Sequence, residues 1–205
     1  MITKDTLMIS LDIETTGTVP GCGILSIGAE AFTLEDKDPR SFFSITIDQV
    51  GRPSKLVDDS ETMLWWSKQD VYARANSFSG TYCYEVALKT FSNWVSIISE
   101  PYRKKRFWVK GLNFDIPILE YCYSCVEYKS KIPWKYHELM DLRTLIEVHS
   151  NIILPKRSSI EHTAINDAMH QAECLRCILN AIRPLFLNEF PESSADPEWG
   201  RLVGY

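Results

Sequence analysis

Two carboxylates separated by a single residue, Asp12 and Glu14, close an apolar stretch near the start of the chain. Residues 8–11 are apolar except for Ser10, and the run is short and branched enough to predict a buried strand. Because side chains alternate along a strand, Asp12 and Glu14 share one face. Two buried anions on one face repel each other unless a proton or a cation lies between them, and oxygen ligands favour Mg²⁺ or Mn²⁺. The pair therefore indicates a metal site, although a polar turn at the end of a strand is the alternative.

Two further acidic residues follow elements that could bring them to the same place. Asp115 lies in the segment 111–117 (GLNFDIP), directly after a predicted strand and in the first turn of a predicted helix, where backbone N–H groups favour an anion. Asp167 lies on a later helix whose small face, suited to close packing on a sheet, consists of Ala164, Ala168 and Ala172. His162 precedes Asp167 by five residues, which on a continuous helix would separate their directions by about 140°. We therefore expect His162 at or before the first turn of that helix.

The elements expected to position these residues form one α/β domain. Strands are predicted at 24–33 and 42–47, and with the first strand they form an antiparallel meander. The remainder alternates helix and strand, which predicts a mixed central sheet flanked by helices. Further expected elements are helices at 61–69, 84–98, 143–149 and 163–181, a helix beginning at Asn113, strands at 107–109 and 137–142, and a solvated turn at 103–106. Residues 49–82 are expected to be an irregular insertion holding Trp65 and Trp66, Pro184 to end the last helix, and 188–205 to be a tail outside a domain of residues 1–187.

Composition limits the class of protein. The 205 residues are 45% hydrophobic, which is enough for one sizeable core. A net charge of −5 argues against a nucleic-acid coat protein, because such proteins are usually basic. No apolar run approaches the roughly 20 residues of a membrane span, and the N-terminus does not resemble a signal peptide. Six cysteines without an export signal indicate reduced thiols, so we expect a cytoplasmic protein with no membrane partner.

Taken together, the three acidic segments resemble a known family. Asp-x-Glu-Thr from Asp12, Asn-Phe-Asp-x-Pro from Asn113 and His-x-x-x-x-Asp from His162 are similar to the motifs of the DEDDh 3′–5′ exonucleases of the RNase H-like superfamily. The sister subgroup has tyrosine four residues before the last aspartate, where this chain has Thr163. Segments around Trp65, Trp108 and Asp141 resemble a narrower branch, the exonuclease A proteins of large tailed phages and related bacterial exoribonucleases. The resemblance covers roughly residues 7–183.

This resemblance implies an RNase H-like fold and a metal-dependent exonuclease that releases 5′-nucleoside monophosphates from the 3′ end of single-stranded DNA or RNA. It implies two Mg²⁺ or Mn²⁺ ions about 4 Å apart, with the ligands Asp12, Glu14, Asp115 and Asp167. His162 would be the general base, since imidazole ordinarily titrates near neutral pH. A bacterial or phage-infected cytoplasm would be its location. Expected substrate contacts are Thr15, Asn113, Phe114, Trp66 and Arg143.

Several alternatives stay open at this point. A catalytically weak nucleic-acid-binding module and an RNase H-like endonuclease share the acidic cluster, and the assembly state is undetermined, with a homodimer as one option. The two Cys-x-x-Cys pairs, at 122–125 and 174–177, could suggest zinc, but their wide separation favours core thiols. One tryptophan of the pair at 65–66 could stack on a base while the other packs in the core. Arg143 could contact a phosphate or form a salt bridge with Asp141.

Overall fold

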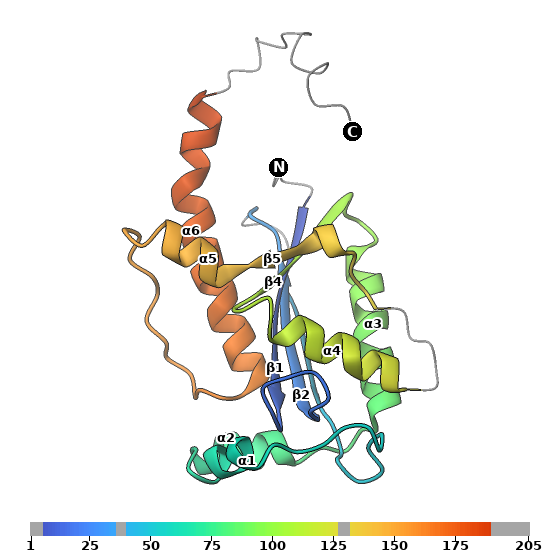
Figure 1. Ribbon diagram of the computed structural model, residues 1–205. Helices are drawn as coiled ribbons and strands as arrows, with labels where there is room; N and C mark the ends of the chain where they lie inside the picture. The colour runs from blue at the N-terminus through green and yellow to red at the C-terminus, as the bar shows by residue number, and fades with distance from the viewer. Residues whose placement is uncertain (1–5, 36–39, 127–131, 190–205) are drawn as a thin grey trace.

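A five-stranded mixed sheet forms the centre of the computed structural model, which describes residues 6–35, 40–126 and 132–189 (Figure 1). The strands lie in the order β3-β2-β1-β4-β5. They are β1 (Thr6–Thr15), β2 (Ile24–Phe32), β3 (Ser41–Thr46), β4 (Lys104–Val109) and β5 (Leu139–Asp141). The first three strands are antiparallel, whereas β4 pairs parallel to β1 and β5 parallel to β4. The predicted meander and mixed sheet are therefore confirmed.

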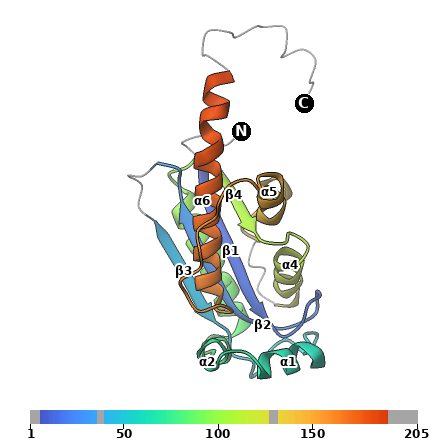
Figure 2. The same cartoon turned by 90° about the vertical axis from the view of Figure 1, so that its left-hand side faces the viewer.

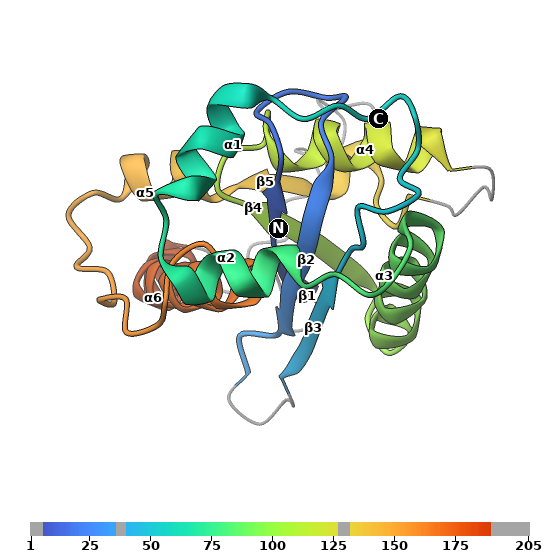
Figure 3. The ribbon, with the colours of Figure 1, turned by 90° about the horizontal axis from the view of Figure 1, so that it is seen from below.

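Helices cover both faces of the sheet, and two more lie below its lower end (Figures 1 and 3). On one face pack α3 (Tyr84–Ser99) and α4 (Asp115–Cys125), and on the other α6 (Ala164–Glu189), as Figure 2 shows, with α5 (Leu142–Val148) beside it. Below the ends of β1 and β2 lie α1 (Ser60–Ser67) and α2 (Val71–Phe78), and a short 3₁₀ turn, Tyr136–Glu138, precedes β5. Within the described residues, no helix is long and apolar enough to cross a bilayer.

The central strand β1 divides its side chains between two cores. Leu7, Ile9 and Leu11 belong to the cluster that includes residues of α3 and α4. Met8 belongs to the other cluster, together with residues of α6. Since side chains alternate, the even positions of β1, including Asp12 and Glu14, face the α6 side. Both faces of β1 are covered, which explains why its sequence is almost continuously apolar up to the acids.

Gly28 lets α6 approach the sheet beside the acids. It pairs with Asp12 across β1 and β2, and a Cβ at this position would lie 2.2 Å from the backbone carbon of Ala164. The first turn of α6 therefore rests directly on the backbone of β2. This close contact fixes the start of α6, and with it Asp167, next to the acidic end of β1.

Several element predictions were wrong in detail. Within the segment 49–82, the helix predicted at 61–69 is found as α1, but the rest of the segment, expected to be irregular, also contains α2. Residues 104–106, expected in a turn, form the first half of β4 because the backbone there pairs with β1. The helix expected from Asn113 begins at Asp115, with Phe114 at its N-cap and no side-chain cap bond.

The final helix also differs from its prediction. It continues through Pro184 to Glu189, past the expected boundary at residue 187. A proline removes its own N–H bond and clashes with the preceding turn, at a cost of about 3 kcal/mol, which a long helix tolerates when the rest of it is well packed. The predicted tail at 188–205 lies mostly outside the described residues, which end at residue 189.

Candidate active site

The C-terminal end of β1 carries the first two acids into a pocket of about 490 Å³. Asp12 and Glu14 both line this pocket, and Glu14 is 7% exposed. Asp12 accepts a hydrogen bond from Gln171 Nε2 at 2.7 Å, which links β1 to α6. The pair predicted from the one-residue spacing thus shares a face, as expected.

Asp115 reaches the same site from the other side of the sheet. It is the first residue of α4 and is 4% exposed. The turn before it uses Gly111, whose φ of 126° is a backbone conformation that favours glycine. Burial raises the pKa of Asp115, and a hydrogen bond from the backbone N–H of Ile13 offsets part of that rise, so this acid lies against the acidic end of β1.

Asp167 and His162 come from the start of α6. Asp167 is 9% exposed, and its Oδ2 accepts a hydrogen bond from the backbone N–H of His162 at 3.0 Å. His162 precedes the helix and has a φ of 62°, in the left-handed region that few non-glycine residues adopt. The expectation that His162 stands before the first turn is confirmed, and the bond to Asp167 stabilises the unusual backbone.

Aromatic and hydroxyl side chains from the lower helices hold His162 in place. Its imidazole makes an edge contact with the Trp65 ring, with centroids 4.8 Å apart. Its carbonyl oxygen accepts a hydrogen bond from Ser77 Oγ on α2 at 3.4 Å. The ring then lies close to two of the acids, because ligand atoms of Glu14, His162 and Asp167 are all within 4.8 Å of one another. The imidazole is therefore near enough either to act on a bound water or to serve as a ligand itself.

Burial raises the pKa values of three of these carboxyls, Asp12, Glu14 and Asp115, and neighbouring carboxylates add to the rise at Asp12 and Glu14. Burial, followed by the charges of Asp167 and Asp115, raises the pKa of Glu14 to about 8. Burial raises the pKa of Asp115 to about 7, and burial with the neighbouring carboxylates also raises that of Asp12 well above its ordinary value. Raised pKa values in a cluster indicate negative charge without sufficient compensation.

This donor set fits a divalent cation. Carboxylate oxygens dominate it, which suits hard ions such as Mg²⁺ and Mn²⁺. Cations between the carboxylates would remove the repulsion that raises their pKa values. The residues able to hold them are Asp12, Glu14, Asp115 and Asp167, with the imidazole of His162 as a further donor near two of these acids.

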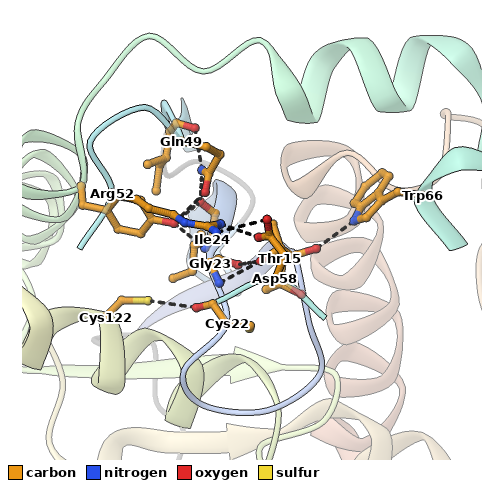
Figure 4. Close-up of polar contacts among 12 residues, drawn as sticks. Thr15, Cys22, Gly23, Ile24, Gln49, Arg52, Asp58, Trp66 and Cys122 are labelled. Carbon is orange, nitrogen blue, oxygen red and sulfur yellow. Dashed lines mark hydrogen bonds and ion pairs between the residues drawn. The ribbon is translucent and has the colours of Figure 1, made fainter. Parts of the chain in front are cut away.

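Both tryptophans of the pair line the pocket, but they differ in how much of the ring is exposed. Trp66, predicted to contact substrate, is 2% exposed, and its indole N–H donates to the carbonyl oxygen of Thr15 at 2.8 Å (Figure 4). Trp66 borders the pocket, as predicted for a substrate contact, but so buried a ring offers a base little surface for stacking. Trp65 is 41% exposed and also lines the pocket, so it is the residue available for stacking.

The other residues predicted to contact substrate differ in whether they line the pocket. Thr15 and Phe114 line the pocket, and the Thr15 hydroxyl donates to the carbonyl oxygen of Gly17 at 2.6 Å. Asn113 is exposed in the turn before α4. Arg143 donates to the carbonyl oxygen of Lys110 at 3.1 Å, and its charge lowers the pKa of Asp115.

Asp141 interacts with Arg143 through the backbone. Its carboxylate accepts a hydrogen bond from the Arg143 backbone N–H at 2.8 Å and thereby caps α5. The expected alternative, a side-chain salt bridge between these residues, is therefore replaced by a helix cap, which leaves the guanidinium to the turn at Lys110.

Two contacts to the acids were missed in the sequence. Gln171 lies one helical turn after Asp167, so the four-residue spacing on α6 was a usable signal for it. Arg157 ion-pairs with Asp167 from the loop between α5 and α6. That loop has no periodic pattern, so nothing local in the sequence indicated where the Arg157 side chain would lie.

The cysteines are free thiols, as expected. Cys122 is buried in the core, where its thiol donates to the carbonyl oxygen of Cys22 at 3.8 Å (Figure 4). Cys174 is buried on α6, and Cys177 contacts the carbonyl oxygen of Ile153 at 3.5 Å. The two Cys-x-x-Cys pairs lie on different helices with different partners, which favours the core-thiol interpretation over zinc.

Comparison with known proteins gives a family and a set of similar folds. Residues 7–179 match the family model described as the 3′–5′ exoribonuclease Rv2179c-like domain. No curated protein sequence matches the chain. E. coli exonuclease I in complex with a dT13 oligonucleotide superposes with a TM-score of 0.57 at 14% identity, covering 88% of this chain and 42% of that one.

Two other solved structures have the same fold. Exonuclease I from Methylocaldum szegediense gives a TM-score of 0.61 at 12% identity over 88% of this chain and 42% of that one. The nuclease domain of 3′hExo, a DEDDh family member bound to rAMP, gives 0.56 at 11% identity over 85% of this chain and 92% of that one. The chain thus spans less than half the length of the exonuclease I proteins it resembles, but most of the length of a single nuclease domain.

Proposed function

The chain belongs to the family of Rv2179c-like 3′–5′ exoribonuclease domains, and from this we propose that it is a divalent-metal-dependent 3′–5′ exonuclease acting on single strands. One observation carries the proposal. Four acids from three separate segments converge with His162 at one end of the sheet, beside a pocket lined by Trp65 and Phe114. Solved folds similar to this one were captured with a dT13 oligonucleotide and with rAMP, which supports a nucleic-acid 3′ end as the partner.

Each residue has a proposed part in the hydrolysis. Asp12, Glu14, Asp115 and Asp167 hold two Mg²⁺ or Mn²⁺ ions, which when bound stabilise negative charge on the reacting phosphate and lower the pKa of water. His162 takes the proton from the attacking water, since its partly exposed imidazole lines the pocket beside Glu14 and Asp167. Attack on the last phosphodiester releases a 5′-nucleoside monophosphate and leaves a new 3′ hydroxyl.

Substrate contacts divide between the base and the backbone of the last nucleotides. Trp65 stacks on a base through its exposed face, a contact worth roughly 1–3 kcal/mol in other proteins. Thr15 and Phe114 border the same pocket, and Asn113 and Arg143 bind the strand outside it. Stacking and contacts to the nucleic-acid backbone do not depend on which base is present, which agrees with an enzyme that removes each nucleotide in turn.

The remaining expectations belong to the same proposal. We propose that the exonuclease unit comprises residues 1–187 and that the protein is cytoplasmic. Its assembly state is either a monomer or a homodimer. Six free thiols agree with a reducing compartment. Light scattering on the purified protein measures the assembly state directly.

Digestion of end-labelled strands tests the activity. Single-stranded RNA and DNA labelled at the 5′ end should shorten in a ladder with Mg²⁺ or Mn²⁺, and a chelator should stop the reaction. Asp12→Asn is the matched inactive control, since it keeps the side-chain shape and removes the charge. A circular single strand, which has no 3′ end, should stay intact; its cleavage would establish the endonuclease alternative, and binding without any cleavage would establish the binding module.

A further inference from the structure

Arg157 places a permanent positive charge inside the acidic site. It lies on the loop between α5 and α6, and its Nη1 donates to Asp167 Oδ1. Its Nε lies 3.6 Å from Glu161 Oε1, and the side chain is 21% exposed. The charge of Arg157 also lowers the pKa of Glu14, so its effect extends beyond the residue that it contacts.

Both carboxylate oxygens of Asp167 are therefore bound by donors of the protein. Oδ1 accepts from Arg157, and Oδ2 accepts from the backbone N–H of His162. The backbone bond leaves a lone pair on Oδ2 available to a cation. The guanidinium is different, because it carries charge at every accessible pH and a divalent ion bound to Asp167 would repel it.

A substrate bound beside Asp167 would offer this guanidinium another strong partner, since Asp167 lines the pocket. A phosphodiester entering the site brings negative charge, and the planar fork of arginine matches the oxygens of a phosphate in a bidentate arrangement. Since Arg157 is carried by a loop and not by a helix, its side chain can exchange partners without moving α6.

We propose that Arg157 is an internal counter-cation of the acidic site that a divalent metal displaces from Asp167, and that it then binds the phosphate of the substrate. In the metal-free protein it offsets part of the repulsion among the carboxylates. In the loaded protein it contacts the substrate backbone. The proposal rests on the proposed function only for its second half, because the first half concerns the metal alone.

Calorimetric titration with Mn²⁺ tests the counter-cation. Arg157→Ala should bind Mn²⁺ about tenfold more tightly than wild type, because the competing cation is gone, whereas Arg157→Lys should stay close to wild type. Arg52→Ala is the matched control: Arg52 also pairs with an aspartate, with a similar 24% exposure, but its partner Asp58 is not one of the four acids of the site. Its Mn²⁺ affinity should not change.

Arg157→Met removes the charge but keeps the packed stem, and replaces the alanine variant if that protein unfolds without metal. Unchanged or weaker Mn²⁺ affinity in both neutral variants would overturn the counter-cation role. This outcome is independent of nuclease activity, so an inactive wild type would reject the proposed function while leaving this comparison decisive.

Steady-state kinetics at saturating Mn²⁺ test the second half. KM for a single-stranded oligonucleotide should rise at least tenfold in Arg157→Ala, with partial recovery in Arg157→Lys because lysine keeps the charge and loses the fork. Arg52→Ala should keep the wild-type KM. An unchanged KM in Arg157→Ala, in a protein whose Mn²⁺ affinity has tightened, would reject the phosphate contact.

Discussion

At the residue scale, the position of His162 is compatible with two chemical roles, metal ligand and general base. His162 is close enough to Glu14 and Asp167 to share a metal with them, yet its side chain is 37% exposed and lines the pocket, as a general base requires. Its left-handed backbone is fixed by the bond from its N–H to Asp167. The imidazole direction therefore depends on Asp167, whichever role it has.

Mn²⁺ binding separates these roles. If His162 is the general base, the variant His162→Ala should keep the Mn²⁺ affinity of the wild type and lose roughly 10²–10⁴-fold in kcat. Asp167→Asn should lose metal affinity and turnover together, because it removes a proposed ligand. Calorimetry and single-turnover rates of both variants measure this, with His149→Ala, outside the pocket, as a control. Equal losses of metal affinity in the two variants would make His162 a ligand and not the base.

At the scale of elements, α1 is joined to the end of β1 by one buried side chain. Trp66 donates its indole N–H to the carbonyl oxygen of Thr15, directly after Glu14 (Figure 4). Its neighbour Trp65 contacts the His162 ring instead. Adjacent residues on a helix point about 100° apart, so one helix can serve the core and the pocket at once.

The two tryptophans should accordingly differ on substitution. Trp66→Ala should lower the free energy of unfolding by roughly 3–5 kcal/mol, because it empties a buried site. Trp65→Ala should leave stability nearly unchanged and raise KM for an oligonucleotide. Chemical denaturation and steady-state kinetics on the same preparations measure both. Purely stability-linked losses at the two positions would leave Trp65 without a substrate role.

The contact between β2 and α6 is the second element-scale feature that the site depends on. Gly28→Ala should push the start of α6 away from the sheet, since its Cβ would meet the Ala164 backbone. Both stability and Mn²⁺ affinity should fall. Gly80→Ala is the matched control for Gly28→Ala, because a Cβ at Gly80 would lie 2.1 Å from the Ile47 backbone, which is outside the pocket. It should lower the melting temperature without weakening Mn²⁺ binding; an equal effect on Mn²⁺ would remove the special role of Gly28.

For the whole molecule, the acidic site opposes folding when no metal is bound. The folded protein holds the proton of Glu14 up to a pKa of about 8, whereas the ordinary value is 4.5. Between these values the unfolded chain releases this proton and the folded one does not, so stability falls as pH rises. Above pH 8 both states are ionised, and the loss is complete.

Thermal unfolding across pH tests this linkage. In the presence of a chelator, the melting temperature should fall from pH 5 to 8, and Mn²⁺ should raise it most at the alkaline end. Glu14→Gln should make the chelated profile less steep and raise the melting temperature at pH 8, because it removes one of the buried groups that have to ionise. A chelated wild type that gains stability over this interval would contradict the prediction.

The sequence by itself determined the chemical set and most of the sheet. Asp12 and Glu14 share a face because a strand alternates, and His162 had to precede its helix because five residues on a helix point it away from Asp167. Such relations are local, so spacing alone defines them. The family motifs that contain these residues predicted a 3′–5′ exonuclease domain, and residues 7–179 match the model of such a domain.

Only the tertiary structure decided which residues complete the site. Whether Trp65 or Trp66 is the buried member of the pair depends on where α1 docks against Thr15, which is 51 residues from Trp66 in the chain. Arg157 reaches Asp167 from a loop without periodicity, and α2 forms in a segment whose pattern predicted no helix. These features result from packing between distant segments, and their free energies depend on contacts that no local spacing encodes.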